Sequence, residues 1–233
     1  MQTDDLYIQV EGKGIPIILL HGWGLNHYYM EPLFQYFKNT YKVCMLDLPG
    51  FGNSILPYAY DLSEYVEKIR EIIEIYELEN PVLVAHSFGA RIAFRYASKY
   101  PTRFVIATGA AGIKPKRGIR YYTKVCIYKI IKKMHLQKEM GSEDYKNAQG
   151  DLKKTFVKIV NDHNHDDILK IKCPILLIWG EKDMETPLWM AKKIEKLNKN
   201  TTLIILKGED HFAYYHQMSQ FIKICEYALK EVK

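Results

Sequence analysis

The chain has few cysteines, no long apolar run and no targeting pattern at its start. Its 4 cysteines are far apart and form no C-x-x-C pair, so nothing indicates a zinc knuckle or a dithiol redox motif. No stretch approaches the roughly 18 to 20 uninterrupted apolar residues of a transmembrane helix. Residues 1–14 are acidic and polar, whereas a signal peptide is basic and then apolar. We therefore expect buried, reduced thiols, a cytoplasmic location and no stable insertion into a membrane.

Positive charge is concentrated in one part of the chain. The net charge is +6, and residues 114–165 hold 13 Lys and Arg against 5 Asp and Glu. A basic segment can attract nucleic acid, anionic lipid or an acidic substrate. The chain is also rich in Lys, Ile, Tyr and Asn, a bias that a low-GC genome alone produces, and we favour this explanation. We expect no nucleic-acid partner, and the sequence leaves the oligomeric state open.

Seven short apolar runs, rich in β-branched residues and bounded by turn formers, have the composition of strands. Most are continuously apolar, which is the pattern of strands buried on both faces of a parallel sheet with helices between them. The runs cover residues 6–10, 16–20, 43–46, 82–85, 104–108, 175–179 and 203–206, and helical spacing occurs over 62–76, 90–99, 190–197 and 217–229. The sequence predicts an α/β fold with a mostly parallel, doubly wound sheet.

The regular alternation of strand and helix stops between residues 113 and 167. Apolar residues from Ile119 to Met134 recur every three or four positions with Lys and Arg between them, as an amphipathic helix requires. A second helix is predicted over residues 151–160. We therefore expect a core made of residues 1–112 and 168–233, with a small helical cap inserted at 113–167.

A serine stands where a predicted strand meets a predicted helix. Ser87 follows the apolar run at 82–85 and has Ala85 and Gly89 two positions on either side. A nucleophile elbow is a tight turn between a strand and a helix, and its crowding requires small residues at those two positions. Glycine is common at both, so Ala85 is a small departure that the space should tolerate. The alternative is an ordinary turn serine, and the layout favours Ser87 as a nucleophile.

A serine hydroxyl is a weak nucleophile, so a base must take its proton and a carboxylate must orient the base. Asp183 follows the apolar run at 175–179, and His211 follows the run at 203–206. Each would therefore lie just beyond a buried strand. The chain order of serine, aspartate and histidine is the order expected for a nucleophile on such a sheet. A turn carboxylate and a loop histidine are the alternatives.

Acyl transfer also requires donors for the oxyanion that develops on the carbonyl oxygen. The run at 16–20 leads into the tetrapeptide HGWG at 21–24, whose glycines allow a loop to bend over the sheet edge. The backbone N–H of Trp23 can then point at the site beside that of Phe88. We expect the side chain of His21 to brace this loop and to take no part in chemistry.

Together, five motifs resemble the α/β-hydrolase superfamily: HGWG at 21–24, DLPGFGNS at 47–54, AHSFG at 85–89, WGEKD at 179–183 and GEDHF at 208–212. Within it the chain is most similar to the compact, cofactor-free group of carboxylesterases, carbon–carbon bond hydrolases and pimeloyl-ester-type esterases. The resemblance implies Ser87 as nucleophile, His211 as base, Asp183 as orienting carboxylate, and Trp23 and Phe88 as oxyanion donors. It implies no cofactor and no metal, and it gives residues 47–54 a role in loop geometry only.

Three other patterns have competing interpretations. The HNHDD segment at 163–167 superficially resembles a metal motif, but it lacks a following histidine, and a polar loop returning from the cap is favoured. His216 is a second candidate base, for which a packed or solvated helix position is favoured. Eight tyrosines form either an aromatic acyl pocket or the packing between cap and sheet. They are Tyr28, Tyr29, Tyr58, Tyr60, Tyr121, Tyr122, Tyr214 and Tyr215.

Three functional classes follow from these residues. The first is hydrolysis of a small acyl substrate, such as an ester, through an acyl-enzyme. The second uses the same residues in an acyltransferase, a perhydrolase or a carbon–carbon bond hydrolase, because one fold supports many chemistries. The third is a binding protein without turnover, and the complete set of Ser87, Asp183 and His211 argues against it. The sequence leaves the natural substrate open.

Overall fold

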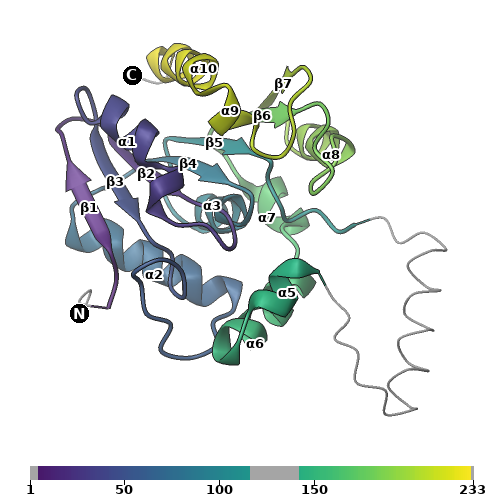
Figure 1. Ribbon diagram of the computed structural model, residues 1–233. Helices are drawn as coiled ribbons and strands as arrows, with labels where there is room; N and C mark the ends of the chain where they lie inside the picture. The colour runs from purple at the N-terminus through teal and green to yellow at the C-terminus, as the bar shows by residue number, and fades with distance from the viewer. Residues whose placement is uncertain (1–4, 116–141, 232–233) are drawn as a thin grey trace.

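The computed structural model describes residues 5–115 and 142–231, and their strands form one seven-stranded sheet with helices on both faces (Figure 1). The strand order is β1-β3-β2-β4-β5-β6-β7. Only β1 runs antiparallel to its neighbour within this sheet. The strands are β1 (Ile8–Glu11), β2 (Pro16–Leu20), β3 (Lys42–Leu46), β4 (Val82–His86), β5 (Phe104–Thr108), β6 (Ile175–Gly180) and β7 (Thr201–Leu206). The predicted mostly parallel α/β fold is confirmed.

The strands are continuously apolar because both faces of the sheet are covered. Along β2, Ile17 and Ile18 are both fully buried, yet they belong to different clusters on opposite faces. Helices α2 (Leu62–Ile75), α3 (Phe88–Lys99) and α8 (Trp189–Leu197) contribute to one cluster. Helices α1 (Glu31–Phe37), α9 (Ala213–His216) and α10 (Met218–Lys230) contribute to the other. A short 3-10 helix, η1 (His27–Tyr29), precedes α1.

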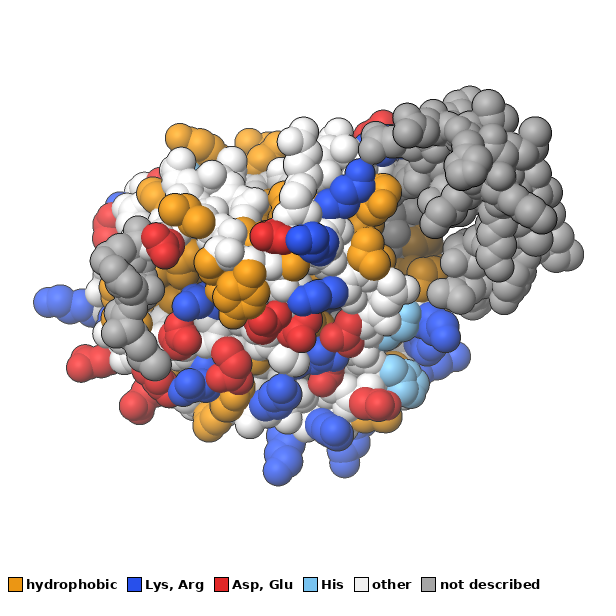
Figure 2. All heavy atoms as spheres, turned by 90° about the horizontal axis from the view of Figure 1, so that it is seen from below, with side chains coloured by type: hydrophobic (Ala, Val, Ile, Leu, Met, Phe, Trp, Pro, Cys, Tyr) orange, Lys and Arg blue, Asp and Glu red, His pale blue; other side chains and the backbone are white. Residues whose placement is uncertain are grey.

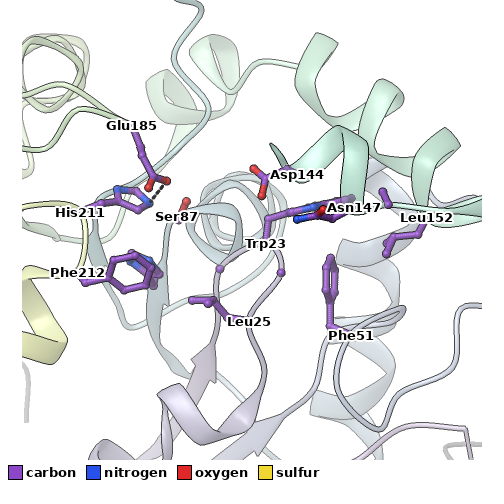
Figure 3. A pocket seen from close by; sticks show the side chains of 14 residues that line it. Trp23, Leu25, Phe51, Ser87, Asp144, Asn147, Leu152, Glu185, His211 and Phe212 are labelled. Carbon is purple, nitrogen blue, oxygen red and sulfur yellow. Dashed lines mark ion pairs between the residues drawn. The ribbon is translucent and has the colours of Figure 1, made fainter. Parts of the chain in front are cut away.

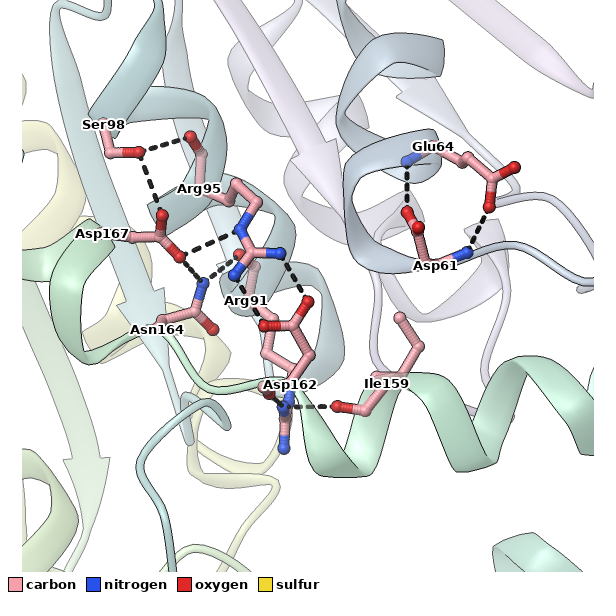
Figure 4. A network of polar contacts seen from close by, with 9 residues as sticks. All are labelled: Asp61, Glu64, Arg91, Arg95, Ser98, Ile159, Asp162, Asn164 and Asp167. Carbon is pink, nitrogen blue, oxygen red and sulfur yellow. Dashed lines mark hydrogen bonds and ion pairs between the residues drawn. The ribbon is translucent and has the colours of Figure 1, made fainter.

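Local signals explain where several helices begin. Helix α2 starts with a capping box in which the Asp61 carboxylate accepts from the Glu64 N–H, and the Glu64 carboxylate accepts from the Asp61 N–H (Figure 4). This reciprocal pair satisfies backbone donors that have no partner within the helix.

The sequence prediction missed α1 and α9. Both are short, at 7 and 4 residues, and so give little periodicity to detect.

Part of the predicted cap lies among the described residues. It contains α5 (Glu143–Asn147), α6 (Gly150–Asn161) and α7 (His165–Lys170). Helix α6 confirms the helix predicted over 151–160, whereas the helix predicted from Ile119 to Met134 lies outside the described residues. The loop predicted at 163–167 is wrong from His165 onward, because α7 begins there, and carboxylates in its first turn favour a helix start. The division into core and cap stays a prediction.

An ionic network fastens the returning segment to α3 (Figure 4). Arg95 pairs with the carboxylates of Asp162 and Asp167, with its Nε 3.0 Å from Asp167 Oδ2. Arg91 donates from Nη1 to the backbone carbonyl oxygens of Ile159, at 2.9 Å, and Asp162. The C-terminal end of α6 is therefore held against the helix that starts directly after Ser87.

Charges of both signs are interspersed on the face of the molecule seen from below in Figure 2. Ion pairs within α2 account for part of this pattern, such as Arg70 with Glu67 at 2.7 Å and Lys68 with Glu71 at 2.6 Å. Within residues 5–115 and 142–231, no helix is long and apolar enough to cross a membrane.

Candidate active site

Ser87 occupies the sharp turn between β4 and α3. Its φ is +49° and its ψ is −107°, a conformation that is strained for a residue with a side chain. The turn is held by its backbone, because the Ser87 N–H donates to the Thr108 carbonyl oxygen at 3.0 Å and the Ser87 carbonyl oxygen accepts from the N–H groups of Ala90 and Ala111. Strain of this kind persists only where the surrounding structure fixes it, and it is common at functional sites.

The small residues on either side of Ser87 are required by space. A Cβ on Gly89 would lie 2.4 Å from the Leu20 carbonyl oxygen and 2.7 Å from that of His21, which is too close for any side chain. Ala85 is 1% exposed and belongs to the core cluster on the face of α2 and α3. The nucleophile-elbow geometry predicted for residues 85–89 is therefore present, and alanine fits where glycine is common.

Asp183 and His211 meet beyond the ends of β6 and β7. Both are nearly fully buried, and His211 Nδ1 lies 2.8 Å from Asp183 Oδ2. Three further donors hold the carboxylate: the N–H groups of Glu185 and Thr186 on Oδ1, and the Thr186 hydroxyl on Oδ2. A carboxylate held in this way fixes the orientation of the imidazole ring. Because the carboxylate engages Nδ1, Nε2 is the ring nitrogen that remains for another partner.

The two loops that carry these side chains are joined through their main chains. A Cβ on Gly180 would lie 2.0 Å from the Asp210 carbonyl oxygen, so only glycine permits this approach. The Lys182 N–H donates to the Glu209 carbonyl oxygen at 2.7 Å, and the Glu181 N–H donates to that of Leu206 at 3.0 Å. Backbone contacts therefore set the spacing between the loops of Asp183 and His211.

Ser87 and His211 line the same cavity, which has a volume of about 390 Å³ (Figure 3). The remaining lining residues are Gly22, Trp23, Gly24, Leu25, Phe51, His86, Asp144, Asn147, Ala148, Leu152, Glu185 and Phe212. A second cavity of about 600 Å³ shares Ser87 and Trp23 with the first and extends along α3 to Phe88 and Arg91. The predicted nucleophile and base thus line one cavity that is large enough for a small substrate.

The loop after β2 approaches the serine from the opposite side. A Cβ on Gly22 would lie 3.3 Å from the Cβ of Ser87, and Trp23 lines both cavities. Phe88 is the first residue of α3, so its N–H has no partner within the helix. The oxyanion-donor role of Trp23 and Phe88 stays a prediction.

Two buried histidines near the site are neutral. Burial lowers the pKa of His21 to about 4, and its Nε2 accepts from the Leu48 N–H at 2.9 Å. It therefore braces the loop, as expected. Burial, followed by the positive charge of His211, holds the pKa of His86 well below its usual range. The ring of His86 lies 4.7 Å from that of His211, so His86 is an uncharged neighbour of the predicted base.

The other candidate residues lie elsewhere. His216 ends α9 and has its Nδ1 3.4 Å from Glu209 Oε2, outside both cavities as the described residues define them. In the HNHDD segment, Asn164 donates to Asp167 at 2.9 Å, which gives these side chains a structural role beside α3. Among the residues described, no group of three or more His, Cys, Asp and Glu side chains is arranged to hold a metal ion.

Among the described residues, tyrosines do not form the wall of either cavity that Ser87 lines. Tyr28 and Tyr58 are exposed, and Tyr214 is buried in the core cluster beside α10. Of the eight candidate tyrosines, the six that lie among the described residues line neither cavity, and Tyr121 and Tyr122 lie outside the described part of the chain. Aromatic lining is supplied by Trp23, Phe51 and Phe212, in addition to Phe88 and Phe156 in the second cavity.

Sequence reasoning missed Glu185, Thr186 and Asp144. The first two lie two and three positions after Asp183. A threonine three positions after an aspartate is a weak signal that its hydroxyl returns to the carboxylate. Asp144 lies in α5 and reaches the cavity (Figure 3). Nothing in its local sequence indicates this position, because it depends on how α5 sits above the sheet.

The comparison with family models agrees with the fold and the elbow. Residues 15–116 match the model described as alpha/beta hydrolase fold. The match contains β2 to β5, the loop at 21–24 and the turn at Ser87. Together with the sheet order and the strained serine described above, this match shows that the chain has the α/β-hydrolase fold.

Relatives match over almost the full length. The chain is 25% identical over 243 residues to the AB hydrolase superfamily protein YisY of Bacillus subtilis, covering 91% of this chain and 90% of that protein. It is 27% identical over 258 residues to a pimeloyl-[acyl-carrier protein] methyl ester esterase of Wigglesworthia glossinidia brevipalpis, covering 96% and 97%. Among solved structures, an esterase from Exiguobacterium antarcticum has a TM-score of 0.78 at 21% identity, covering 97% and 95%.

Proposed function

We propose that the chain is a serine hydrolase that cleaves a small ester or a similar acyl substrate through an acyl-enzyme. One observation carries the proposal: the Asp183–His211 pair, 2.8 Å apart, opens on the cavity that the strained Ser87 lines. Esterases among the related proteins support the same reaction class. In the proposal, Ser87 is the nucleophile, His211 the base, and Asp183 the carboxylate that orients it.

In the first half-reaction, Ser87 Oγ attacks the carbonyl carbon while His211 Nε2 takes the hydroxyl proton. The C–O π electrons move onto the carbonyl oxygen, and a tetrahedral intermediate forms. Asp183 stabilises the imidazolium from the Nδ1 side. The intermediate then collapses: the bond to the leaving group breaks, and Nε2 donates its proton to that group. An alcohol leaves, and the acyl group remains on Ser87.

In the second half-reaction, water takes the place of the alcohol. His211 Nε2 removes a proton from the water, whose oxygen attacks the acyl carbon. Collapse of the second intermediate breaks the bond to Ser87 Oγ, which recovers its proton from Nε2, and the acid is released. In both halves, the N–H groups of Trp23 and Phe88 are the donors for the oxyanion, a contribution worth about 3 kcal/mol per donor in comparable sites.

A fluorophosphonate probe tests the nucleophile. The wild-type protein should become covalently labelled, and Ser87→Ala should abolish labelling because the attacking oxygen is absent. Intact-protein mass and a thermal melt would establish that the variant is folded. A panel of aryl esters of graded acyl length, beside an activated carbon–carbon cleavage substrate, would then measure turnover. Labelling that persists in Ser87→Ala would show that another residue is the nucleophile.

A further inference from the structure

One acidic side chain lies at the free nitrogen of the proposed base. Glu185 Oε2 is 3.4 Å from His211 Nε2, and the Glu185 side chain is 66% exposed. Figure 3 shows its carboxylate directed at the His211 ring, with Ser87 nearby. Glu185 lines both cavities that contain Ser87. Its backbone N–H donates to Asp183, so the loop of the orienting carboxylate also holds Glu185 at this place.

The position of Glu185 relates it to the leaving group of the substrate. Since Asp183 occupies His211 Nδ1, Nε2 is the nitrogen that delivers the proton to the departing group. The leaving-group oxygen must therefore come within hydrogen-bond distance of Nε2. Substituents on that oxygen then pass beside the Glu185 carboxylate, whereas the acyl portion extends from the carbonyl carbon in another direction.

The other charges around the first cavity do not offset this one. Its charged lining residues among those described are Glu185 and Asp144, and no Lys or Arg of that part of the chain lines it. Burial, and to a smaller extent the charge of Glu143, raise the pKa of Asp144. Arg91 lines only the second cavity, where it donates to carbonyl oxygens at the end of α6.

We propose that Glu185 sets the leaving-group preference of the enzyme: esters with a positively charged leaving group are favoured over neutral esters of the same shape, and neutral ones over negatively charged ones. The inference rests on the proposed hydrolase function and adds a substrate class to it. It differs from the possibility that the basic segment at 114–165 attracts an acidic substrate, because the described lining is acidic at the leaving-group side.

The expected effect is moderate. Glu185 is exposed, and an exposed ion pair changes a free energy by about 0.2–1 kcal/mol, which is a factor of up to about five. We therefore expect the preference for a cationic over a neutral leaving group to fall about threefold on loss of the charge. Any influence of Glu185 on the imidazolium of His211 acts on all esters alike, and it cancels when the ratio of two substrates is taken.

Three esters with one common acyl group test the proposal. The choline ester carries a cation, the 3,3-dimethylbutyl ester is its neutral isostere, and a sulfopropyl ester carries an anion. The values of kcat/KM are measured for wild type, Glu185→Gln and Glu195→Gln at low ionic strength. Glu195 is exposed on α8 and lines neither cavity, so this control loses the same charge at a distance. Glutamine keeps the shape and the backbone N–H of residue 185, so folding should be unaffected.

The outcomes separate the two proposals. The proposal is supported if kcat/KM in wild type is higher for the choline ester than for the dimethylbutyl ester, and if the ratio of these two values drops about threefold in Glu185→Gln. The kcat/KM of the sulfopropyl ester should rise in Glu185→Gln. In Glu195→Gln none of these values should change. Equal ratios in wild type and Glu185→Gln, with the neutral ester still cleaved, overturn the role of Glu185 and leave the hydrolase proposal standing. A wild-type preference for the anionic ester also overturns it. No turnover of any ester, including the aryl panel, would overturn both.

Discussion

Two buried Asp–His pairs stand beyond the ends of β3 and β6, and they differ in what lies beside the histidine ring. Asp47 follows β3 and lies 2.9 Å from His27 Nδ1, whereas Asp183 follows β6 and lies 2.8 Å from His211 Nδ1. Both aspartates and both histidines are at most 5% exposed. His27 stacks on Tyr7 with ring centroids 4.0 Å apart. His211 lines the cavity that contains a serine.

The surroundings of the two carboxylates explain this difference. Asp47 accepts from the N–H groups of His27 and Asn53, so it closes the loop at 47–54 around itself. His27 lines neither of the cavities defined by the described residues. An aspartate bonded to a histidine is therefore not sufficient to indicate a general base. The informative observation is the access of the histidine's other nitrogen to a nucleophile and a substrate-sized space.

The largest effect should come from breaking the pair at the cavity. Asp183→Asn and His211→Ala should each lower kcat/KM for an aryl ester by about a thousandfold or more, because the members of a triad act as a unit. Steady-state kinetics on the two purified variants measures this. A rate within tenfold of wild type for either variant would mean that the wrong residue has been assigned.

The pair at β3 should respond in stability instead. Asp47→Asn replaces a fully buried acceptor of two backbone N–H groups, and we expect the free energy of unfolding to fall by about 2 kcal/mol. Once folded, the variant should keep kcat/KM within about tenfold of wild type. Urea denaturation and aryl-ester kinetics on the same sample would test both parts. A thousandfold loss of activity in a stable Asp47→Asn protein would erase the distinction between the pairs.

The smallest effect concerns the hydroxyls that support each aspartate. The Thr186 hydroxyl donates to Asp183 Oδ2 at 2.8 Å, and that of Ser54 donates to the Asp47 carbonyl oxygen at 2.7 Å. Thr186→Val should lower kcat/KM about fivefold, the value of one hydrogen bond. Ser54→Ala should cost about 1 kcal/mol of stability and leave kcat/KM unchanged. Steady-state kinetics and urea denaturation on both variants would measure these effects. A loss of activity in Ser54→Ala, together with a loss of stability alone in Thr186→Val, would contradict this assignment.

The sheet could be predicted well from the sequence because its strands are apolar on both faces. The runs at 16–20 and 104–108 coincide with β2 and β5, and the other strand boundaries differ by at most two residues. The predicted starts of α3 and α8 are within two residues of the observed ones. Short helices such as α1 escaped detection, because seven residues give less than two full turns of periodicity.

The site was predictable where a residue's type and its place after a strand coincide. Ser87, Asp183 and His211 satisfy that condition, and the structure brings Asp183 to His211 and places His211 in the cavity of Ser87. Glu185 and Asp144 could not be predicted in the same way. Each resembles an ordinary surface carboxylate in sequence, and its relation to the cavity arises from the path of a loop or from the placement of α5.

The close approach of Gly180 to Asp210 has a consequence for how the site tolerates change. Because main-chain atoms of the two loops rest on one another, the separation of Asp183 and His211 is fixed by the backbone framework, as is the distance between two strands. Exposed side chains on these loops, such as that of Lys182, can be exchanged without altering it. Exposed side chains such as that of Glu185 can then be replaced while this separation is kept, so new specificity can arise from side chains alone.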